Sequence, residues 1–151
     1  MAGSSVWRDD AVAALGAFAT RAGIPTFLNG MGRGCLPREH PAFFDLARKD
    51  ALAAADVVLV VGTPLDFRLG YGTEPTFAAG AKVVQVDVDA AEIGRNRPID
   101  VGIVGDSRSV LEALAAGWRG AVPPAWPRHL REKEAARRER QREHEESDQR
   151  P

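Results

Sequence analysis

The residues that could do chemistry in this chain lie where predicted strands end. Gly62 and Thr63 follow the apolar run of residues 57–61, and Asp87 ends the run of residues 82–87. A glycine at a strand end lets a ligand approach the backbone, and a carboxylate there accepts hydrogen bonds from vicinal ribose hydroxyls. Taken alone, Gly62 is better explained as a residue that only turns the chain. Two such strand ends in one small domain predict a nucleotide site.

The elements that must position these residues follow an α/β pattern. Residues 57–61 are apolar on both faces and too few for a helix, which is typical of a central strand in a parallel sheet that is covered on both sides. Further strands are predicted at residues 24–28, 82–87 and 101–106, the last ending in Gly-Asp. One helix is predicted to end at Ala22, where Gly23 marks the stop, and others to span residues 43–55 and 107–116. Asp89, with Glu92 three residues on, is predicted to cap a helical turn. The pattern predicts a Rossmann-like parallel sheet flanked by helices.

The first residues depart from this pattern. Residues 1–5 form a small-residue loop that leads straight into a helix, and Asp9 and Asp10 suit the N-terminus of that helix. Such a loop normally follows a strand in an α/β domain, so we expect the first strand to be missing. The alternative is a domain that simply starts with a helix.

A second glycine loop, residues 29–34, follows the predicted strand at 24–28. It is not the dinucleotide fingerprint, because that pattern needs a helix to open inside the glycine run, and here Pro37 keeps the chain in a loop. The loop could still approach a ligand, with Arg33 available for a phosphate. A loop that merely turns the chain is an equal alternative.

Composition excludes several classes of function. The chain has 151 residues, 44% of them hydrophobic, which is enough for one domain with a real core. Its net charge of −1 argues against a nucleic-acid partner. No apolar run approaches the roughly 20 residues that cross a bilayer. The single cysteine, Cys35, excludes a disulfide framework, and no Cys/His cluster has metal-ligand spacing. We therefore expect a cytoplasmic protein with no membrane partner and no metal site.

A change in composition near residue 120 divides the chain. Residues 1–120 form the predicted α/β domain, whereas residues 121–151 begin with a proline-rich connector that includes Pro127 and continue mostly as Arg and Glu. Glu134 and Arg138 begin a row at i, i+4 spacing, which is typical of a solvated helix. We expect a helical linker or tail with no apolar stripe that could dock. RNA binding is the alternative, but the acidic residues balance the basic ones.

Three segments resemble one enzyme family. They are Gly62-Thr63-Pro64-Leu65-Asp66-Phe67-Arg68, Val86-Asp87-Val88-Asp89-Ala90-Ala91-Glu92-Ile93-Gly94-Arg95-Asn96-Arg97 and Val104-Gly105-Asp106. In order and spacing they resemble the central domain of thiamine-diphosphate enzymes, in the group of acetolactate synthase, oxalyl-CoA decarboxylase and 2-hydroxyacyl-CoA lyase. The resemblance covers roughly residues 3 to 117.

The resemblance implies a six-stranded parallel sheet that holds FAD in acetolactate synthases or ADP in the CoA-linked branch. The matched positions that would line this nucleotide are Gly3, Ser4, Gly62, Thr63, Asp87, Val88 and Asp106. Thiamine diphosphate and Mg²⁺ belong to the family's other domains, which this chain lacks, so no catalytic residue is expected here. The implied partners are those missing domains, in the same or other chains, within a homo-oligomer.

The branch within the family is less sharply indicated. Pro64 stands where acetolactate synthases usually carry an arginine that helps hold the flavin, and residues 69–72 are more similar to the CoA-linked branch. Residues 66–68 are more similar to the synthases. We therefore expect an acetolactate-synthase-like domain fragment that is not catalytic alone. The alternatives are the same domain of the CoA-linked branch, a structural or subunit-contact domain with no nucleotide, and a stand-alone module that binds an adenine nucleotide.

Overall fold

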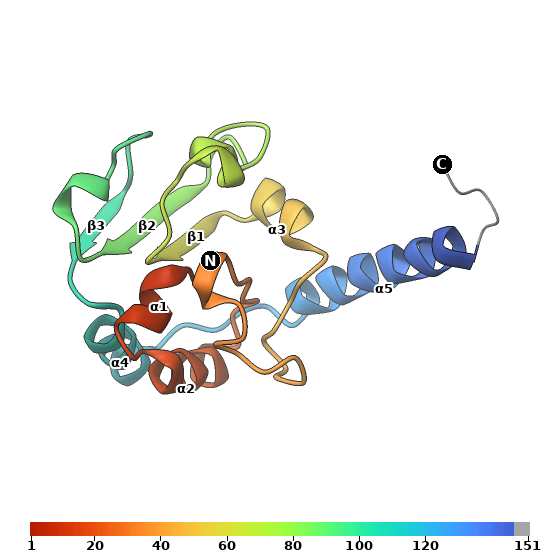
Figure 1. Ribbon diagram of the computed structural model, residues 1–151, viewed down its shortest axis with the longest axis horizontal. Helices are drawn as coiled ribbons and strands as arrows, with labels where there is room; N and C mark the ends of the chain where they lie inside the picture. Colours follow the sequence, from red (N-terminus) through yellow and green to blue (C-terminus); the bar gives the residue numbers. More distant parts are fainter. Residues whose placement is uncertain (147–151) are drawn as a thin grey trace.

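The centre of the molecule is a parallel sheet of three strands. A computed structural model describes residues 1–146, and its strands are β1 (Val57–Val61), β2 (Lys82–Asp87) and β3 (Val101–Val104), in the order β1-β2-β3 (Figure 1). Both pairings are parallel, with Val57 opposite Lys82 and Val84 opposite Val101. The carboxyl ends of the strands therefore reach the same edge of the sheet, which confirms the predicted α/β class.

Helices cover one face of the sheet. They are α1 (Ser4–Arg8), α2 (Val12–Ala22) and α4 (Ser107–Gly117), which lie together below the sheet in Figure 1. The buried side chains of α2 recur at helical spacing, and Phe18 among them meets the Trp118 ring edge to face at 5.8 Å. Gly23 ends α2 in the left-handed conformation, as its position predicted.

The opposite face has a core of its own. It is covered by α3 (Arg48–Ala54) and by the 3-10 turn η2 (Phe67–Gly72), and two shorter 3-10 turns, η1 (Gly30–Gly32) and η3 (Ala90–Glu92), lie in loops. Leu52 and Leu69 pack there on Val60 and Val83 of the sheet. Because β1 is covered on both faces, its continuous apolar run is explained.

The acids near the N-terminus serve a different helix from the one predicted. Ala11 is the N-cap residue of α2 and offers no side-chain hydrogen bond, so Asp9 and Asp10 do not cap it. Instead, Asp9 accepts a hydrogen bond of 2.8 Å from the backbone N–H of Ser107, the first residue of α4. The carboxylate thus meets the positive end of a helix dipole, but that helix lies far along the chain.

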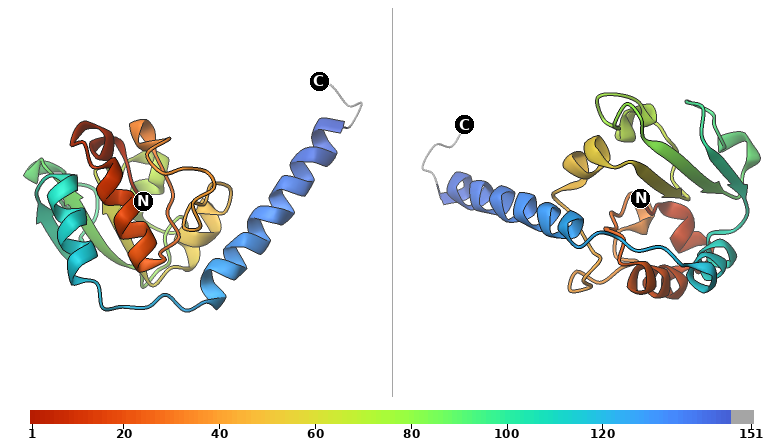
Figure 2. Two further views of the ribbon diagram at one scale, coloured as in Figure 1. Left: turned by 90° about the horizontal axis from the view of Figure 1, so that it is seen from below. Right: turned by 180° about the vertical axis from the view of Figure 1, so that it is seen from behind.

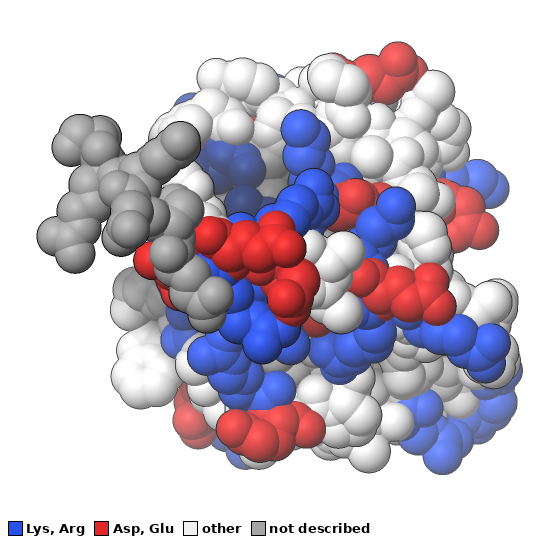
Figure 3. Space-filling model, turned by 90° about the vertical axis from the view of Figure 1, so that its right-hand side faces the viewer, with Lys and Arg blue, Asp and Glu red and all other residues white. Residues whose placement is uncertain are grey.

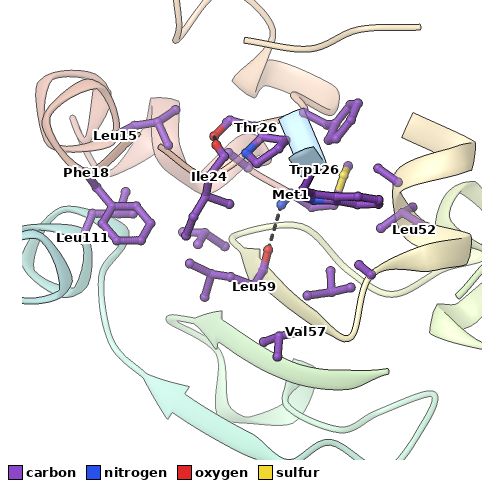
Figure 4. Close-up of a pocket in the computed structure, with 17 residues that line it drawn as sticks. Met1, Leu15, Phe18, Ile24, Thr26, Leu52, Val57, Leu59, Leu111 and Trp126 are labelled. Atoms are coloured by element: carbon purple, nitrogen blue, oxygen red, sulfur yellow. Dashed lines mark hydrogen bonds between the residues drawn. The ribbon is translucent and has the colours of Figure 1, made fainter. Parts of the chain in front are cut away.

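The first residues of the chain lie beside β1. Ala2 forms parallel bridges with Val61 on one side and Leu28 on the other, and the Met1 amine donates to the carbonyl of Leu59 at 2.7 Å (Figure 4). The backbone N–H and C=O groups of successive residues point to opposite sides of a strand, so those of Val57 and Leu59 point away from β2. They face the edge of β1 along which Met1 and Ala2 lie, and we call the space along this edge the lane. A cavity of about 90 Å³ continues the lane beyond Met1. Within residues 1–146 this lane holds bridges only, not a strand.

Two predicted elements are shorter in the structure. Residues 24–28 form isolated bridges rather than a strand, because their neighbours on both sides pair only briefly. The predicted helix over 43–55 begins only at Arg48, because the backbone N–H of Phe44 is bonded to Thr26 and is held extended. The implied six-stranded sheet is therefore reduced to three strands with bridges in the described residues.

The charged tail is a helix, as predicted, but its first half docks. α5 (Ala125–Glu146) includes Pro127 in its first turn, a position that suits proline, so the connector ends earlier than expected. Leu130 is fully buried in a cluster of aromatic and alanine side chains, and Glu134 is 1% exposed. The tail has no apolar stripe, as expected, but single residues dock its first half, which the sequence did not predict. The rest of α5 projects away from the domain (Figure 2).

Candidate functional site

The ends of β1 and β2 enclose a hollow of about 480 Å³, which we call the strand-end pocket. It is lined by Ser4, Arg8, Met31, Gly62, Pro64, Asp87, Val88, Asp89 and Glu92. Four of the predicted site residues, Ser4, Gly62, Asp87 and Val88, are thus brought together. The arrangement arises because parallel strands end at one edge, where α1 also begins.

Gly62 is needed for packing between β1 and α1. Its φ is +58°, and a Cβ at this position would lie 2.2 Å from the Cβ of Ser5. The carbonyl of Gly62 also accepts from the backbone N–H of Ser5 at 3.1 Å. The space that a side chain would need at residue 62 is therefore occupied by α1 rather than being open to a ligand.

Gly3 and Thr63 lie behind the pocket wall. A Cβ at Gly3 would lie 2.3 Å from the Cβ of Thr63, so the two loops are in close contact. The hydroxyl of Thr63 accepts a hydrogen bond of 3.1 Å from the side-chain amide of Asn29, and both side chains are buried. Both predicted residues belong to the support of the pocket and not to its lining.

Asp87 is the carboxylate best placed to bind a ligand. It is the last residue of β2 and is 7% exposed. One carboxylate oxygen, Oδ1, accepts from the backbone N–H of Asp89 at 3.1 Å. The other oxygen makes no hydrogen bond with the rest of residues 1–146, and it is available to hydroxyl donors in the pocket.

Two neighbouring acids act as helix caps. Asp89 accepts from the backbone N–H of Ala91 at 2.9 Å, which confirms the capping role predicted for it, and it lines the pocket as well. Asp106 accepts from the backbone N–H of Ser109 at 2.8 Å, and these hydrogen bonds lower the pKa of its carboxyl. Asp106 caps α4 and lies outside the pocket lining, unlike the nucleotide contact predicted for it.

Arg8 is the residue that sequence reasoning missed. Among the residues that the structure describes, it is the only cation that lines the pocket, and its Nη2 donates to the Ser5 hydroxyl at 2.8 Å. The prediction began the first helix near Asp9, so Arg8 was placed before it. The spacing of Ser4 and Arg8, one helical turn apart, was the signal that could have found it.

The arrangement can bind a polar ligand that carries hydroxyl and phosphate groups. A buried carboxylate can hold vicinal hydroxyls, and a guanidinium can pair with a phosphate. Among the residues described, no group of three His, Cys, Asp or Glu side chains is placed to hold a metal ion. The helices within residues 1–146 do not include one that is both long and apolar enough to cross a membrane.

Comparison with known families identifies the family of this domain. Residues 1–114 match the family described as the central domain of thiamine pyrophosphate enzymes. The chain belongs to this family. The thiamine pyrophosphate family therefore accounts for the domain that carries the strand-end pocket, and it confirms the resemblance read from the sequence.

Relatives of both expected branches are similar to this central domain. The acetolactate synthase large subunit of Mycobacterium tuberculosis is 39% identical over 130 residues, covering 86% of this chain and 23% of that protein. The 2-hydroxyacyl-CoA lyase 2 of Danio rerio is 38% identical over 115 residues, covering 73% of this chain and 18% of the lyase. The chain thus spans about a quarter or less of the length of these relatives.

A solved structure shares the fold. The thiamine diphosphate-dependent 4-hydroxybenzoylformate decarboxylase of Rhodococcus jostii superposes with a TM-score of 0.56 at 26% identity. The match covers 81% of this chain and 25% of the decarboxylase. This central domain is thus similar to part of an acetolactate synthase, part of a 2-hydroxyacyl-CoA lyase and part of a thiamine diphosphate-dependent decarboxylase.

Proposed function

We propose that this chain is the nucleotide-supporting central domain of a thiamine-dependent decarboxylase or carboligase that acts on 2-keto acids or 2-hydroxyacyl-CoA. The observation that carries the proposal is the buried Asp87 carboxylate, which keeps one oxygen free in a strand-end pocket. The pocket, at about 480 Å³, falls within the size range of small-molecule sites. The ligand would be FAD, as in acetolactate synthases, or ADP, because each carries ribose hydroxyls for Asp87 and phosphates for Arg8.

Different residues of the pocket would bind different groups of such a nucleotide. Asp87 would accept hydrogen bonds from the vicinal ribose hydroxyls, and Arg8 would pair with a phosphate. Asp89 would hold the following turn in place through its bond to Ala91. The domain would therefore orient a nucleotide and support domain packing without taking part in the chemistry.

The chemistry itself would belong to the complete enzyme. When bound in the complete enzyme, thiamine diphosphate would supply a nucleophilic carbon for reaction at a carbonyl group, and the surrounding protein would supply orientation. We propose that the other domains of the family, in the same or other chains, hold this cofactor and Mg²⁺. The assembly would be a homo-oligomer in the cytoplasm.

A second candidate is a domain that serves only in subunit contacts. Two large apolar side chains that line the pocket, Met31 and Val88, are 53% and 48% exposed. Exposed apolar groups gathered in one area are typical of surfaces that another domain covers. In this alternative the strand-end pocket binds no nucleotide, and the same surface packs against a neighbouring domain.

Calorimetric titration with ADP and with FAD separates the two candidates. The test compares Asp87→Asn with Asp106→Asn, because both remove one carboxylate charge and asparagine still caps α4. We expect Asp87→Asn to weaken binding by about tenfold and Asp106→Asn by less than about twofold. No binding to the parent chain would favour the contact domain, and equal losses in both variants would show that Asp87 has no special role.

A further inference from the structure

A second hollow lies away from the strand-end pocket, between the glycine loop, the start of α3 and the tail helix α5. Its volume is about 680 Å³, and we call it the basic pocket. Its wall carries the cations Arg33, Arg38, Arg48, Lys49 and Arg137 against one carboxylate, that of Asp45. On the face shown in Figure 3 the surface is hollowed, and Lys and Arg side chains lie inside the hollow.

Most of this positive charge is not neutralised. Asp45 pairs with Arg38 at 3.7 Å. Arg33, Arg48 and Lys49 make no ion pair or side-chain hydrogen bond with residues 1–146. The chain as a whole has a net charge of −1, so this local excess of cations is not a consequence of composition.

The wall formed by α5 is held in a fixed place. Glu134 accepts from the backbone N–H groups of Asp45 and Leu46, at 2.5 and 2.9 Å. Arg137 pairs with Asp50 at 2.5 Å and donates to the carbonyl of Leu46 at 2.8 Å. Because both sides of the hollow are joined by these bonds, a ligand would meet an ordered site.

The floor of the basic pocket is apolar. Leu28, Phe43 and Leu46 line the hollow together with the cations, and they are half-buried. Such a floor suits the organic body of a ligand, while the cations suit its anionic end. Arg33, which the sequence had marked for a phosphate, faces this hollow and not the strand-end pocket.

We propose that the basic pocket binds a small anion that carries a di- or triphosphate group. The phosphate oxygens pair with Arg33, Arg48 and Lys49, the cations that lack a protein partner. This site is separate from the nucleotide proposed for the strand ends and does not depend on it, because the two linings share no residue.

Calorimetric titration of the full chain with inorganic triphosphate at low ionic strength tests the proposal. The pocket variant is Arg48→Gln with Lys49→Gln, and the matched control is Arg128→Gln with Lys133→Gln, which removes the same charge from exposed positions of α5 outside the pocket. We expect affinity to fall at least about tenfold in the pocket variant and less than about twofold in the control.

A single change on the exposed loop, Arg33→Gln, serves as a second variant in case the pair at α3 disturbs folding. It should weaken triphosphate binding by about threefold or more, with an unchanged melting temperature. The proposal is overturned if the parent chain gives no binding heat. Equal weakening in the pocket and control variants overturns it as well, because the attraction would then be non-specific.

Two sources of the phosphate group are distinguished by comparing ATP with inorganic triphosphate in an Asp87→Asn background. Tighter binding of ATP assigns a nucleotide whose body contacts the apolar floor, and equal binding assigns a free polyphosphate; both outcomes support the site. One result would contradict the basic-pocket site. In that result Asp87→Asn abolishes ATP binding, whereas the change at Arg48 and Lys49 leaves ATP binding intact.

Discussion

The backbone of Gly3 faces Thr63 so closely that a Cβ on residue 3 would lie 2.3 Å from the Cβ of Thr63. The neighbouring carbonyl of Gly62 would lie 2.5 Å away. Both neighbours are buried, so neither can move aside without disturbing β1. The contact therefore ties the first residues of the chain to the end of the central strand.

The Gly3 contact predicts a strong effect of one methyl group. Gly3→Ala should lower the free energy of unfolding by about 2 kcal/mol, since a Cβ here overpacks a buried contact. Gly16→Ala is the control, because residue 16 lies in α2 and its Cβ position has no atom within 4 Å apart from its chain neighbours and the backbone of its own helix. It should raise stability by up to about 1 kcal/mol, because alanine favours a helix. Urea unfolding measures both, and equal effects would contradict the packing argument.

Docking of the tail predicts that α5 contributes to stability. Leu130 is fully buried against Phe44 and Ala51, so Leu130→Ala should cost about 3 kcal/mol and expose α5 to hydrogen exchange. Lys133→Ala on the exposed side should change stability by less than about 0.5 kcal/mol. If both variants behaved alike in urea unfolding, the first half of α5 would not be docked.

The amine of Met1 predicts a dependence of stability on pH. Burial lowers the pKa of this amine from 8.0 to about 5, so the unfolded chain binds a proton more readily than the folded one. Stability should be full above pH 8 and fall as the pH drops toward 5, by up to about 4 kcal/mol. Urea unfolding across this range measures the effect. In a chain with an acetylated Met1 this component should be absent, and an identical pH profile would refute the assignment.

The cap at Asp106 predicts a smaller effect. Asp106→Ala removes the acceptor for the Ser109 N–H and should lower the melting temperature, whereas Asp106→Asn should leave it nearly unchanged. Thermal unfolding followed by circular dichroism measures both. Hydrogen bonds lower the pKa of the Asp106 carboxyl in the folded chain, so the cap stabilises the fold above pH 4 and loses this effect as the pH falls further. The loss of stability caused by Asp106→Ala should therefore become smaller below pH 4.

Local chemistry explains which parts of the fold could be read from sequence. The strands β1 and β2, the stop at Gly23 and the cap at Asp89 depend on residues close in the chain, and each was predicted. The role of Asp9 at the start of α4 could not be read, because its partner lies 98 positions away. Docking of α5 was missed for the same reason, since Leu130 looks isolated in a charged segment.

The candidate site shows the same division. Asp87 and Val88 follow a recognisable strand, so their place at the sheet edge was predictable. Thr63 follows the other strand but turns toward Asn29, and only the packing of the two loops decides this direction. Arg8 depended on where α1 begins, and helix ends are the part of a fold least determined by local sequence.

The lane beside β1 limits where a fusion partner or label can be attached to this protein. The Met1 amine points into the fold between β1 and residues 26–28, whereas α5 carries the other end of the described chain clear of the domain (Figures 2 and 4). Anything fused ahead of Met1 must pass between those two backbones before it reaches solvent. Affinity tags, fluorophores and surface attachment therefore belong beyond α5, where they leave the sheet undisturbed.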